Sequence, residues 1–536
     1  MTQNKNLLSR RTLLGTLIAV PIFYFTGSKA NQLAADPTGE KELAPLFPEM
    51  AQEDLAIGEI QKATSSVQLP WLQQGGTIND ASHLNKTAVY GIVSVSNEQE
   101  IADTLRFARE NKLNVSIAAV RHSMGGQAFA HNALVMNMLR FNKVELDEAN
   151  KLITVQSGAT WHNIQNAIHP KYAVKAMQSS DIFSVGGSIS VNAHGMDHRA
   201  GSVGRTIRSL RVILADGTIV KASREENAEL FHLIIGGYGL FGIVLDATLE
   251  ITENSIYAPA RRLIDYQQFP EIFSQELLPD EKLGLFYAHM STAPQSFLKE
   301  MMLYTYSEVD LPDAEIPPLG EVSSTKLRRL VLNASKLGGM AMRLKWFAEK
   351  NIEPRLESCS VVSRNQAMKE GEACLVSRNE PMHDSVPYLQ NTLPDETDIL
   401  HEYFIPRNQF VPFIDGLRQI MVTNEGNLLN CSVRVVHKED NFLNYAPDDA
   451  FSIVLYINQR TDEAGHAKMR KITGELIDLT LQVGGRFFLP YQLYYTGEQL
   501  QAAYPMINDF FDAKKKYDPD AILANTFYRK YGMSES

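Results

Sequence analysis

The order of apolar and polar residues near the start of the folded part of the chain predicts a strand, a helix and a second strand. β-branched and apolar residues dominate VYGIVSV and, further along, NVSIAAV. Between the two runs, apolar residues recur at helical spacing, at Ile101, Leu105 and Ala108. A capping box at Ser96 and Gln99 fits the start of this helix. The stretch therefore predicts a βαβ unit.

Further along the chain, alternating apolar and polar residues predict antiparallel hairpins. We assign one to KVELDEANKLITVQSG and one to LRVILADGTIVKAS, because each holds two β-rich runs separated by turn-forming residues. The second places Asp216 and Gly217 at its turn, where a type I′ turn needs residues that tolerate a positive φ. Hairpins beside a βαβ unit predict an α+β fold with a mixed sheet, rather than a doubly wound fold.

The pattern becomes more helical after about residue 256. One peripheral helix with a basic face is predicted in RRLVLNASKLGGMAMRLKWFAEK. Clustered basic residues on a helix usually form a solvated surface, and we prefer that interpretation to a binding site for an anionic partner.

One glycine-rich heptad, GGYGLFG, has the spacing of a dinucleotide-binding fingerprint at Gly237, Gly239 and Gly242. That fingerprint binds a pyrophosphate when a strand precedes it and a helix follows, because the helix N-terminus supplies the amides. Here the helical spacing of ENAELFHLII comes first and the β-rich GIVLDATLEI follows. This order argues against a Rossmann NAD site.

Composition changes the picture in three ways. A chain of 536 residues exceeds one ordinary core, so two domains are expected. The net charge of −11 disfavours nucleic acid as a partner, because a polyanionic surface repels phosphate backbones. The three cysteines, Cys359, Cys374 and Cys431, lack zinc, haem and C-x-x-C spacing, while a disulfide between two of them stays open.

The N-terminus has the features of an export signal. Paired arginines precede an apolar run, Leu13–Phe25, and a small-x-small triplet, Ser28–Ala30, follows. The pattern matches a twin-arginine signal peptide over residues 1–30, which implies the twin-arginine translocation machinery as a partner and a periplasmic or secreted location. Export of already folded protein favours a tightly held cofactor. The alternative is an uncleaved anchor in the inner membrane, although the run is shorter than the ~20 residues of a spanning helix.

Two glycine-bearing segments carry the candidate chemistry. In AAVRHSMGGQ, a strand ends in a turn that presents His122. In SSDIFSVGGSISVNAHGMDHRAGSVG, glycines among small residues let a ligand lie close to the backbone. The glycines concerned are Gly186, Gly187, Gly195, Gly201 and Gly204. The same segment holds His194, Asp197 and His198, which raise a metal site as an alternative, but the glycine density favours a flat, extended cofactor over an ion.

Taken in order, these segments resemble flavoproteins of the vanillyl-alcohol oxidase family, which have PCMH-type FAD-binding domains. The matching motifs are VRHSMGGQ, VGGSISVNAHG, LRVILADGTIV, LIIGGYGLFGIV and YDPDAILANTFYRKYG. Within the family the sequence is most similar to aldonolactone and alditol oxidases, and HGMDH with GGRFFLPYQ also resembles decaprenylphosphoryl-ribose oxidases. The resemblance covers nearly all of the chain beyond the signal peptide.

The resemblance implies a bipartite FAD-binding domain that is split by an α/β cap domain for the substrate. The implied divisions are an N-terminal extension at 31–85, the FAD-binding domain at 86–255, the cap at 256–485 and a C-terminal segment at 486–536 that returns to the FAD-binding domain.

The histidine of the first segment matches the family position whose imidazole is bonded to the 8α-methyl group of the flavin. The resemblance therefore implies FAD bound covalently through His122; the alternative is a capping histidine with FAD held without a bond. Amides of the same segment are expected to wrap the pyrophosphate as a nest, and Ile243 or Val244 to reach the adenine. The implied cofactor-binding residues are Ala118, Ala119, Val120, Arg121, His122, Ser123, Met124, Gly125, Gly126, Gln127, Ser179, Ser184, Val185, Gly186, Gly187, Val191, Asn192, Ala193, His194, Ile243 and Val244.

Flavin-dependent dehydrogenation needs a group that takes the hydroxyl proton and a positive charge near the reacting atoms. Strand alternation in NLLNCSVRVV places Arg434 on a polar face, as a candidate cation or simply a surface arginine. Glu402 in ILHEYFIP is a further candidate, or a strand-edge residue. By resemblance, Tyr491 lies over the flavin, where decaprenylphosphoryl-ribose oxidases carry a lysine, so their substrate does not transfer directly. Tyr491 or His194 is then the proton acceptor or hydrogen-bond donor.

These features predict an exported FAD-dependent oxidase or dehydrogenase that oxidises the CH–OH group of a sugar, polyol or aldonolactone-like substrate. The flavin would be reoxidised by O2 or by a quinone-linked acceptor. Two alternatives stay open: C–N oxidation of an amine, as in cytokinin dehydrogenases, and a flavin- or sugar-binding protein without turnover. Neither a bound metal nor a nucleic acid is expected.

Overall fold

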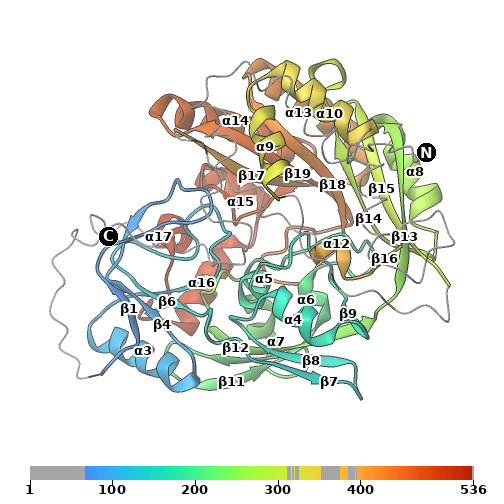
Figure 1. Cartoon of the computed structure of the whole chain (residues 1–536). Helices are drawn as coiled ribbons and strands as arrows, with labels where there is room; N and C mark the ends of the chain where they lie inside the picture. The colour runs from blue at the N-terminus through green and yellow to red at the C-terminus, as the bar shows by residue number, and fades with distance from the viewer. Residues whose placement is uncertain are drawn as a thin grey trace, which may run out of the picture.

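The computed structural model describes residues 67–310, 316, 319, 325–351, 375–383, 393 and 395–533. The predicted signal peptide and most of the N-terminal extension lie outside these residues, as do Cys359 and Cys374. Cys431 is a buried free thiol. Helices pack on mixed and antiparallel sheets (Figure 1), which confirms the predicted α+β class. None of the described helices has the length and apolar character required to cross a membrane.

A four-stranded sheet holds the predicted βαβ unit. Its order is β1-β4-β6-β5, and β4 and β5 both run parallel to β6. Helix α3 joins β4 to β5 and buries the three predicted apolar residues. Its N-cap is Asn97, which accepts the amide of Glu100, so the capping box predicted at Ser96 was wrong by one residue. The bounds are β1 (Trp71–Gln74), β2 (Thr77–Ile78), β3 (Thr87–Ala88), β4 (Gly91–Ser94), α3 (Glu98–Glu110), β5 (Val115–Ala118) and β6 (Leu134–Asn137).

A six-stranded sheet follows, in the order β11-β10-β12-β8-β7, with β9 paired to β12. Both predicted hairpins form, β7 with β8 and β10 with β11. At the second turn only Gly217 has a positive φ, 91°, and its amide donates to the carbonyl of Leu214. The turn is therefore type I followed by a left-handed glycine, and not the predicted type I′. The bounds are β7 (Val144–Asp147), β8 (Leu152–Gln156), β9 (Tyr172–Val174), β10 (Ile207–Ile213), β11 (Ile219–Ala222) and β12 (Ile243–Glu253).

Short helices pack on this sheet, and one of them comes directly before the GGYGLFG heptad. Helix α7 precedes the heptad and β12 follows it, which is the predicted order. The glycines serve protein packing, because a Cβ on Gly237 would lie 1.9 Å from the carbonyl oxygen of Leu233. The bounds are α4 (Trp161–Ile168), α5 (Val185–Val191), α6 (Val203–Thr206) and α7 (Ala228–Ile234).

The second half of the chain builds an eight-stranded antiparallel sheet in the order β16-β13-β15-β14-β18-β19-β17-β20. Side chains alternate across the sheet, so residues such as Glu402, Ser452 and Arg434 share one of its two faces. Strand bounds are β13 (Ile256–Asp265), β14 (Leu283–Met290), β15 (Glu300–Glu308), β16 (Val376–Ser377), β17 (Glu396–Pro406), β18 (Asn427–Val436), β19 (Ala450–Arg460) and β20 (Arg486–Phe487). Short helices between them are η3 (Tyr266–Gln268), α8 (Phe269–Ile272), η4 (Phe273–Leu277), η5 (Pro294–Ser296), α12 (Glu380–His383) and η8 (Arg407–Gln409).

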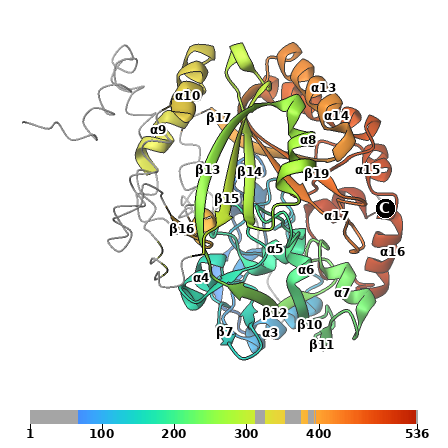
Figure 2. The same ribbon diagram turned by 90° about the vertical axis from the view of Figure 1, so that its right-hand side faces the viewer.

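Different helices cover the two faces of this sheet (Figure 2). Helices α13 (Phe410–Thr423) and α14 (Glu463–Gln482) lie on one side, and α9 (Thr325–Ser335) and α10 (Gly339–Asn351) on the other. The single basic helix predicted for the last two was wrong, because the chain breaks at Gly338 with φ 119°. Its basic run is also not wholly solvated, since Lys336 is buried in an ion pair with Asp398 at 2.6 Å.

The last described segment lies against the first sheet. Leu523 forms a parallel bridge with Val115, and the hydroxyl of Ser116 donates to the carbonyl of Ala524 at 2.6 Å. These partners are about 408 residues apart in sequence, so the C-terminal segment packs against a sheet formed near the start of the described chain. The helices of this segment are α15 (Gly497–Ala503), α16 (Ile507–Tyr517) and α17 (Thr526–Tyr531).

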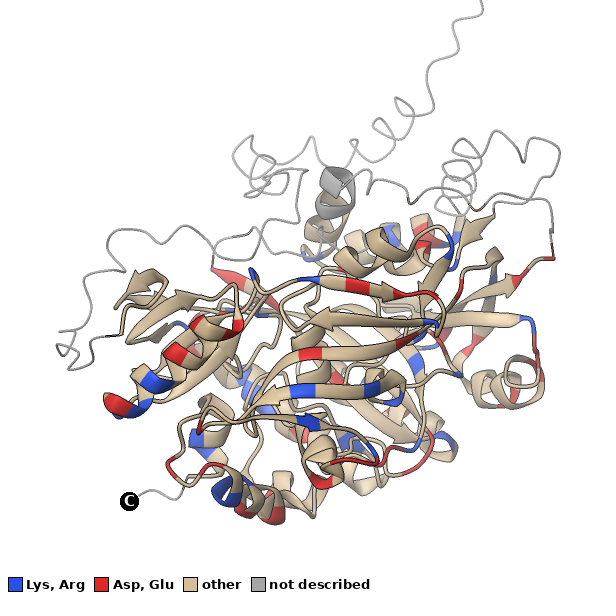
Figure 3. Cartoon of the chain, turned by 90° about the horizontal axis from the view of Figure 1, so that it is seen from below, with Lys and Arg blue, Asp and Glu red and all other residues tan. Residues whose placement is uncertain are grey.

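Charged residues of both signs are interspersed over the face seen from below (Figure 3). Opposite charges pair across elements, as in Arg211 with Asp246 and Lys175 with Glu250. Exposed pairs of this kind contribute little to stability. The net negative charge is thus distributed rather than concentrated on this face.

Candidate active site

Three of the predicted catalytic residues meet at the carboxylate of Glu402 on β17. The Nε2 atom of His194 hydrogen-bonds Oε1, and the hydroxyl of Ser452 on β19 donates to the same oxygen at 2.6 Å. The hydroxyl of Tyr491 donates to Oε2 at 3.1 Å. His194 follows α5 in the first unit, whereas Glu402 and Ser452 belong to the eight-stranded sheet. The site therefore forms where the two halves of the protein meet.

The predicted cation, Arg434, lies on the same face of the sheet. In the pairing of β18 with β19 it is opposite Ser452. Its Nε atom is buried and has no hydrogen-bond partner among the described residues. Burial lowers the pKa of Arg434, and the charge of Glu402 opposes that shift. Because a guanidinium titrates above about pH 12 in water, Arg434 stays a cation near neutral pH.

The surroundings set the protonation of the two acidic groups. Burial raises the pKa of Glu402, but the charge and hydrogen bond of His194, the bond from Ser452 and the charge of Arg434 outweigh it and lower the pKa below its ordinary value. Glu402 is thus a carboxylate at neutral pH. Burial, followed by the charge and hydrogen bond of Glu402, holds the pKa of Tyr491 well above its ordinary value. Tyr491 is therefore a neutral hydrogen-bond donor, and a poor proton acceptor by itself.

The imidazole of His194 has one engaged and one open nitrogen. We assign the proton to Nε2, because that atom faces the carboxylate of Glu402. The Nδ1 atom is buried without a hydrogen-bond partner among the described residues, so in the neutral form of the ring its lone pair faces no protein donor. A carboxylate that orients an imidazole and leaves its second nitrogen free is the arrangement of a general base. Of the two predicted proton acceptors, the geometry favours His194.

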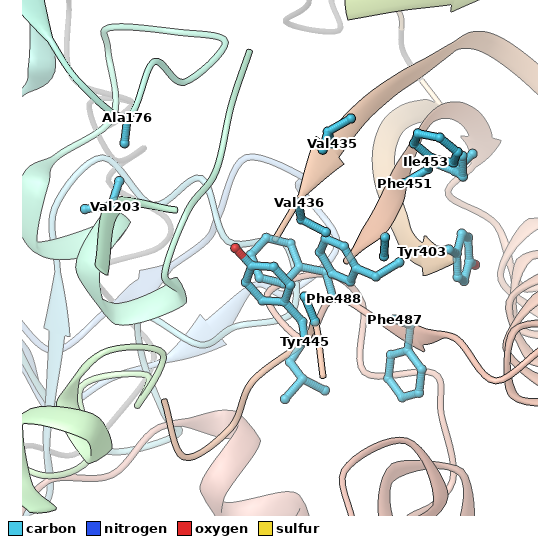
Figure 4. Packing of buried hydrophobic residues seen from close by; sticks show 14 of the residues in the cluster. Ala176, Val203, Tyr403, Val435, Val436, Tyr445, Phe451, Ile453, Phe487 and Phe488 are labelled. Carbon is cyan, nitrogen blue, oxygen red and sulfur yellow. The ribbon is translucent and has the colours of Figure 1, made fainter. Parts of the chain in front are cut away.

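Aromatic side chains pack beside this polar group, and Figure 4 shows two of them, Tyr445 and Phe488. Tyr445 stacks on Phe404 with ring centroids 4.2 Å apart and meets Phe488 edge-on at 5.1 Å. The ring of His194 lies 5.6 Å from Phe404 and 5.8 Å from Tyr445. Apolar rings on several sides exclude water, which strengthens the electrostatic interactions of the Glu402 carboxylate.

A second buried carboxylate, Glu439, lies in the loop after β18. Its Oε1 atom accepts a hydrogen bond from Asn192 at 2.8 Å, and Asn192 in turn accepts the hydroxyl of Tyr445 on its carbonyl. Burial raises the pKa of Glu439 from 4.5 to about 8, although the hydrogen bond from Asn192 opposes the shift. Glu439 is therefore protonated at neutral pH and joins the cap to the residue two places before His194.

This raised pKa makes stability depend on pH. The folded protein keeps a proton that the unfolded chain releases, so the contribution of Glu439 is complete below pH 4.5 and is lost as pH rises towards about 8. The variant Glu439→Gln imitates the protonated acid. At about pH 8 we expect its melting temperature to exceed the wild-type value by roughly 2–4 °C, with no difference at about pH 5. Thermal melts at both pH values test this, and an equal difference at both would contradict it.

The predicted flavin-linking residue, His122, is held by the loop after β5. Burial, followed by the charge of Arg121, lowers the pKa of His122 from 6.5 to about 4, so the imidazole is neutral. Its Nε2 atom is buried without a hydrogen-bond partner among the described residues, and the ring meets Phe183 edge-on at 4.8 Å. A neutral ring with an unused nitrogen is the state in which histidine can act as a nucleophile.

The rest of this loop divides into two halves. Met124, Gly125 and Gly126 are buried, and their amides donate to Pro490, Gln127 and Asp80 respectively. A nest over the whole segment 118–127 is therefore incorrect, because these amides already have protein acceptors. Ala119, Val120, His122 and Ser123 are half-buried and form the part of the loop that a ligand can reach.

In the second glycine segment, α5 presents two faces. Val185 and Ile189 are buried, while Gly186, Gly187, Ser190 and Val191 are accessible. Ser184 is the N-cap, and its hydroxyl accepts the amide of Gly187. The predicted lining residues thus fall into two groups. The small, accessible residues can face a flat ligand, whereas Val185 lies inside the core. Ser179 and Ala193 are half-buried, and Ile243 and Val244 are buried at the start of β12, beside β10.

Most glycines of this segment have a structural role that differs from the predicted one. A Cβ on Gly195 would lie 1.6 Å from the carbonyl oxygen of Met177, and one on Gly204 would lie 2.7 Å from Asn192. Gly201 has φ 75°. Glycine at these positions thus allows close contacts within the protein, so glycine density alone does not identify the residues that contact a cofactor.

The residues that suggested a metal alternative are separated by their partners. The carboxylate of Asp197 forms an ion pair with Arg378 at 2.5 Å, whereas His194 bonds Glu402. Within the described ranges, no group of three or more His, Cys, Asp or Glu side chains could hold a metal ion.

Two contributors to the site were not predicted. Ser452 is a polar residue inside the apolar strand AFSIVLYINQR, and that contrast could have identified it. Asp80 accepts the amide of Gly126 at 2.9 Å, and burial raises its pKa. Its sequence surroundings offer no comparable signal.

Comparison with known proteins agrees with this architecture. Residues 90–223 match the model of an FAD binding domain, and residues 379–531 match that of D-arabinono-1,4-lactone oxidase. The chain is thus an FAD-dependent oxidoreductase that resembles the PCMH-type flavoproteins. FAD fits the site, because the accessible half of the 118–127 loop, the small face of α5 and the open nitrogens of His122 and His194 offer backbone and polar atoms to a planar ligand.

The relatives differ in how much of their length aligns with this chain. Decaprenylphosphoryl-beta-D-ribose oxidase of Mycolicibacterium smegmatis is 25% identical over 463 residues, 82% of this chain and 94% of the relative. An uncharacterized oxidoreductase of the fasciation locus of Rhodococcoides fascians is 28% identical over 155 residues, 28% of this chain and 35% of the relative. Cytokinin dehydrogenase 2 of Arabidopsis thaliana is 27% identical over 188 residues, 34% of this chain and 36% of the relative. Alignments with the last two thus span only about a third of each relative.

Proposed function

We propose that this flavoprotein oxidises the CH–OH group of a sugar, polyol or lactone-like substrate. The observation that carries the proposal is the buried Glu402–His194 pair, whose open Nδ1 atom lies in the same site as the Arg434 cation. An alcohol needs such a base to lose its hydroxyl proton, whereas an amine already has a lone pair. A relative aligned over most of its length acts, by its name, on a ribose derivative, which supports a sugar-like substrate.

Each residue of the site has its own role in removing the hydroxyl proton. His194 accepts the hydroxyl proton at Nδ1, and Glu402 stabilises the resulting imidazolium through Nε2. Tyr491 and Ser452 hold the two carboxylate oxygens in place. Arg434 stabilises the negative charge that develops on the substrate oxygen as the proton leaves. Bound FAD supplies the acceptor for the hydride from the substrate carbon.

We also propose that FAD is bonded covalently to His122. The neutral imidazole, whose Nε2 atom has no hydrogen-bond partner among the described residues, supports this. A covalent bond would retain the cofactor after export, and the twin-arginine pattern of residues 1–30 supports export to the periplasm or beyond. Reoxidation by O2 or by a quinone-linked acceptor belongs to the same proposal.

Acid precipitation of the purified protein tests the covalent bond. We expect the yellow colour to stay with the wild-type pellet and to move to the supernatant for His122→Ala. His162→Ala is a matched control, because His162 lies on α4 and its ring is hydrogen-bonded to Asp181, and its pellet should stay yellow. Colour in the supernatant for the wild type would contradict the bond, while leaving bound FAD in place.

A substrate panel tests the reaction. We expect polyols, sugars or aldonolactones to bleach the flavin absorbance without oxygen, and peroxide or a reduced quinone analogue to appear when an acceptor is added. Bleaching by amines alone would replace the proposal with C–N oxidation. A stable flavin that none of these compounds bleaches would indicate a binding protein without turnover.

A further inference from the structure

The helix pair α9–α10 carries the largest concentration of exposed apolar side chains. Eleven large apolar residues are exposed in the described part of the chain, and four of them lie between positions 337 and 347. These are Leu337, Met340, Leu344 and Phe347. Met340 and Phe347 are 69% and 57% exposed. A soluble surface rarely collects so many apolar side chains in one place unless they meet a partner.

Helix α10 is apolar on two opposite sides. Its inner side packs Met342 and Trp346 against the eight-stranded sheet, where the indole nitrogen of Trp346 donates to Glu300 at 2.6 Å. Met340, Leu344 and Phe347 recur at helical spacing on the outer side. The apolar side chains of the inner side are thus already buried against the eight-stranded sheet. The helix lies at the edge of the molecule, with its outer side turned away from that sheet (Figure 2).

The same segment is basic in an acidic protein. Residues 325–351 hold seven basic residues and one acid, a net charge of +6, whereas the whole chain has −11. The basic residues are Lys326, Arg328, Arg329, Lys336, Arg343, Lys345 and Lys350. Lys336 and Lys350 pair with Asp398 and Glu300 outside the segment, which offsets two of these charges. Arg343 is exposed between Met340 and Leu344.

We propose that the outer side of α9–α10 docks on the surface of an anionic lipid bilayer. Apolar side chains on one side of a helix enter the boundary between headgroups and acyl chains, and neighbouring arginine and lysine residues are attracted by anionic headgroups. A second copy of this chain would bring two basic segments together, which disfavours a symmetric dimer through this surface. The docked protein would lie on the membrane and not cross it.

Docking does not depend on the proposed reaction. It needs neither substrate nor flavin turnover, so a failed oxidation assay and a failed binding assay are separate results. The inner side of α10 covers the face of the eight-stranded sheet that bears Arg434. Docking through α10 would therefore bring this face of the sheet close to the bilayer.

Vesicle sedimentation with the full chain tests the proposal. The variant Met340→Ser/Leu344→Ser/Phe347→Ser is compared with Leu72→Ser/Ile219→Ser/Val422→Ser, which removes three exposed apolar residues elsewhere. On vesicles of phosphatidylglycerol and phosphatidylethanolamine, we expect the first variant to lose about tenfold or more in bound fraction and the control to bind like the wild type. Both variants keep residues 1–30, so binding by the N-terminal apolar run is equal in all three proteins.

A local probe distinguishes the surface from the rest of the chain. In a Cys359→Ser/Cys374→Ser background, a polarity-sensitive dye at Phe347→Cys should shift to the blue on anionic vesicles, less on phosphatidylcholine and less in about 1 M salt. The same dye at Ile219→Cys should not shift. Equal vesicle binding by both triple variants, or an unshifted dye at position 347, would overturn the proposal. A dimer without vesicles that only the α10 variant disrupts would also overturn it, by making a second copy the occupant.

Discussion

Replacing Glu402 with glutamine lowers kcat by about 10²–10⁴-fold. The amide cannot stabilise the imidazolium that forms on His194, and its NH2 group can reverse the tautomer by donating to Nε2. Anaerobic reduction of the flavin by the best substrate of the panel measures the loss. The flavin absorbance of the purified variant should equal that of the wild type, because Glu402 contributes to proton transfer rather than to retention of FAD.

Glu396→Gln provides the matched control for this substitution. Glu396 begins the same strand, and burial raises its pKa, but it lies at the far end of β17 from His194. Its kcat should stay close to the wild-type value. Wild-type activity in Glu402→Gln would remove the carboxylate–imidazole pair from the mechanism, whereas equal losses in both variants would indicate a general effect on the sheet.

Replacing Arg434 with methionine lowers kcat by about 10²–10³-fold. Methionine keeps much of the volume but leaves the developing charge on the substrate oxygen without a cation in a buried site. Arg434→Lys should recover part of the loss, because it keeps the charge but not the planar fork of donors. Steady-state kinetics separate the two roles, since a cation that acts in the transition state changes kcat more than KM.

Arg262→Met is the control for Arg434. It removes an arginine of the same sheet that is exposed and paired with Glu276 at 2.7 Å, so it should change neither constant. An Arg434→Met variant that raises KM alone would place Arg434 in substrate binding and not in charge stabilisation.

Local signals in the sequence predicted local structure well. The apolar face of α3, both hairpins, and the helix-then-strand order around GGYGLFG depend on contacts between residues close in sequence. Two errors, in the N-cap of α3 and in the type of the second turn, also arose from local sequence. Asn97 displaced Ser96 as the N-cap because both residue types cap helices, and Gly217 alone took a positive φ because a type I turn with a glycine bulge fits the same residues.

The sequence by itself indicated the α+β class, the resemblance to PCMH-type flavoproteins and the residues that could act as base and cation, because each follows from residue types and their order. The tertiary structure alone decided that His194 and Glu402, 208 residues apart, share a hydrogen bond, that Ser452 joins them, and that the amides of Gly125 and Gly126 already have protein acceptors. Such facts depend on the docking of the cap sheet against the first unit. Docking buries charges and amides in pairs that no short stretch of sequence contains.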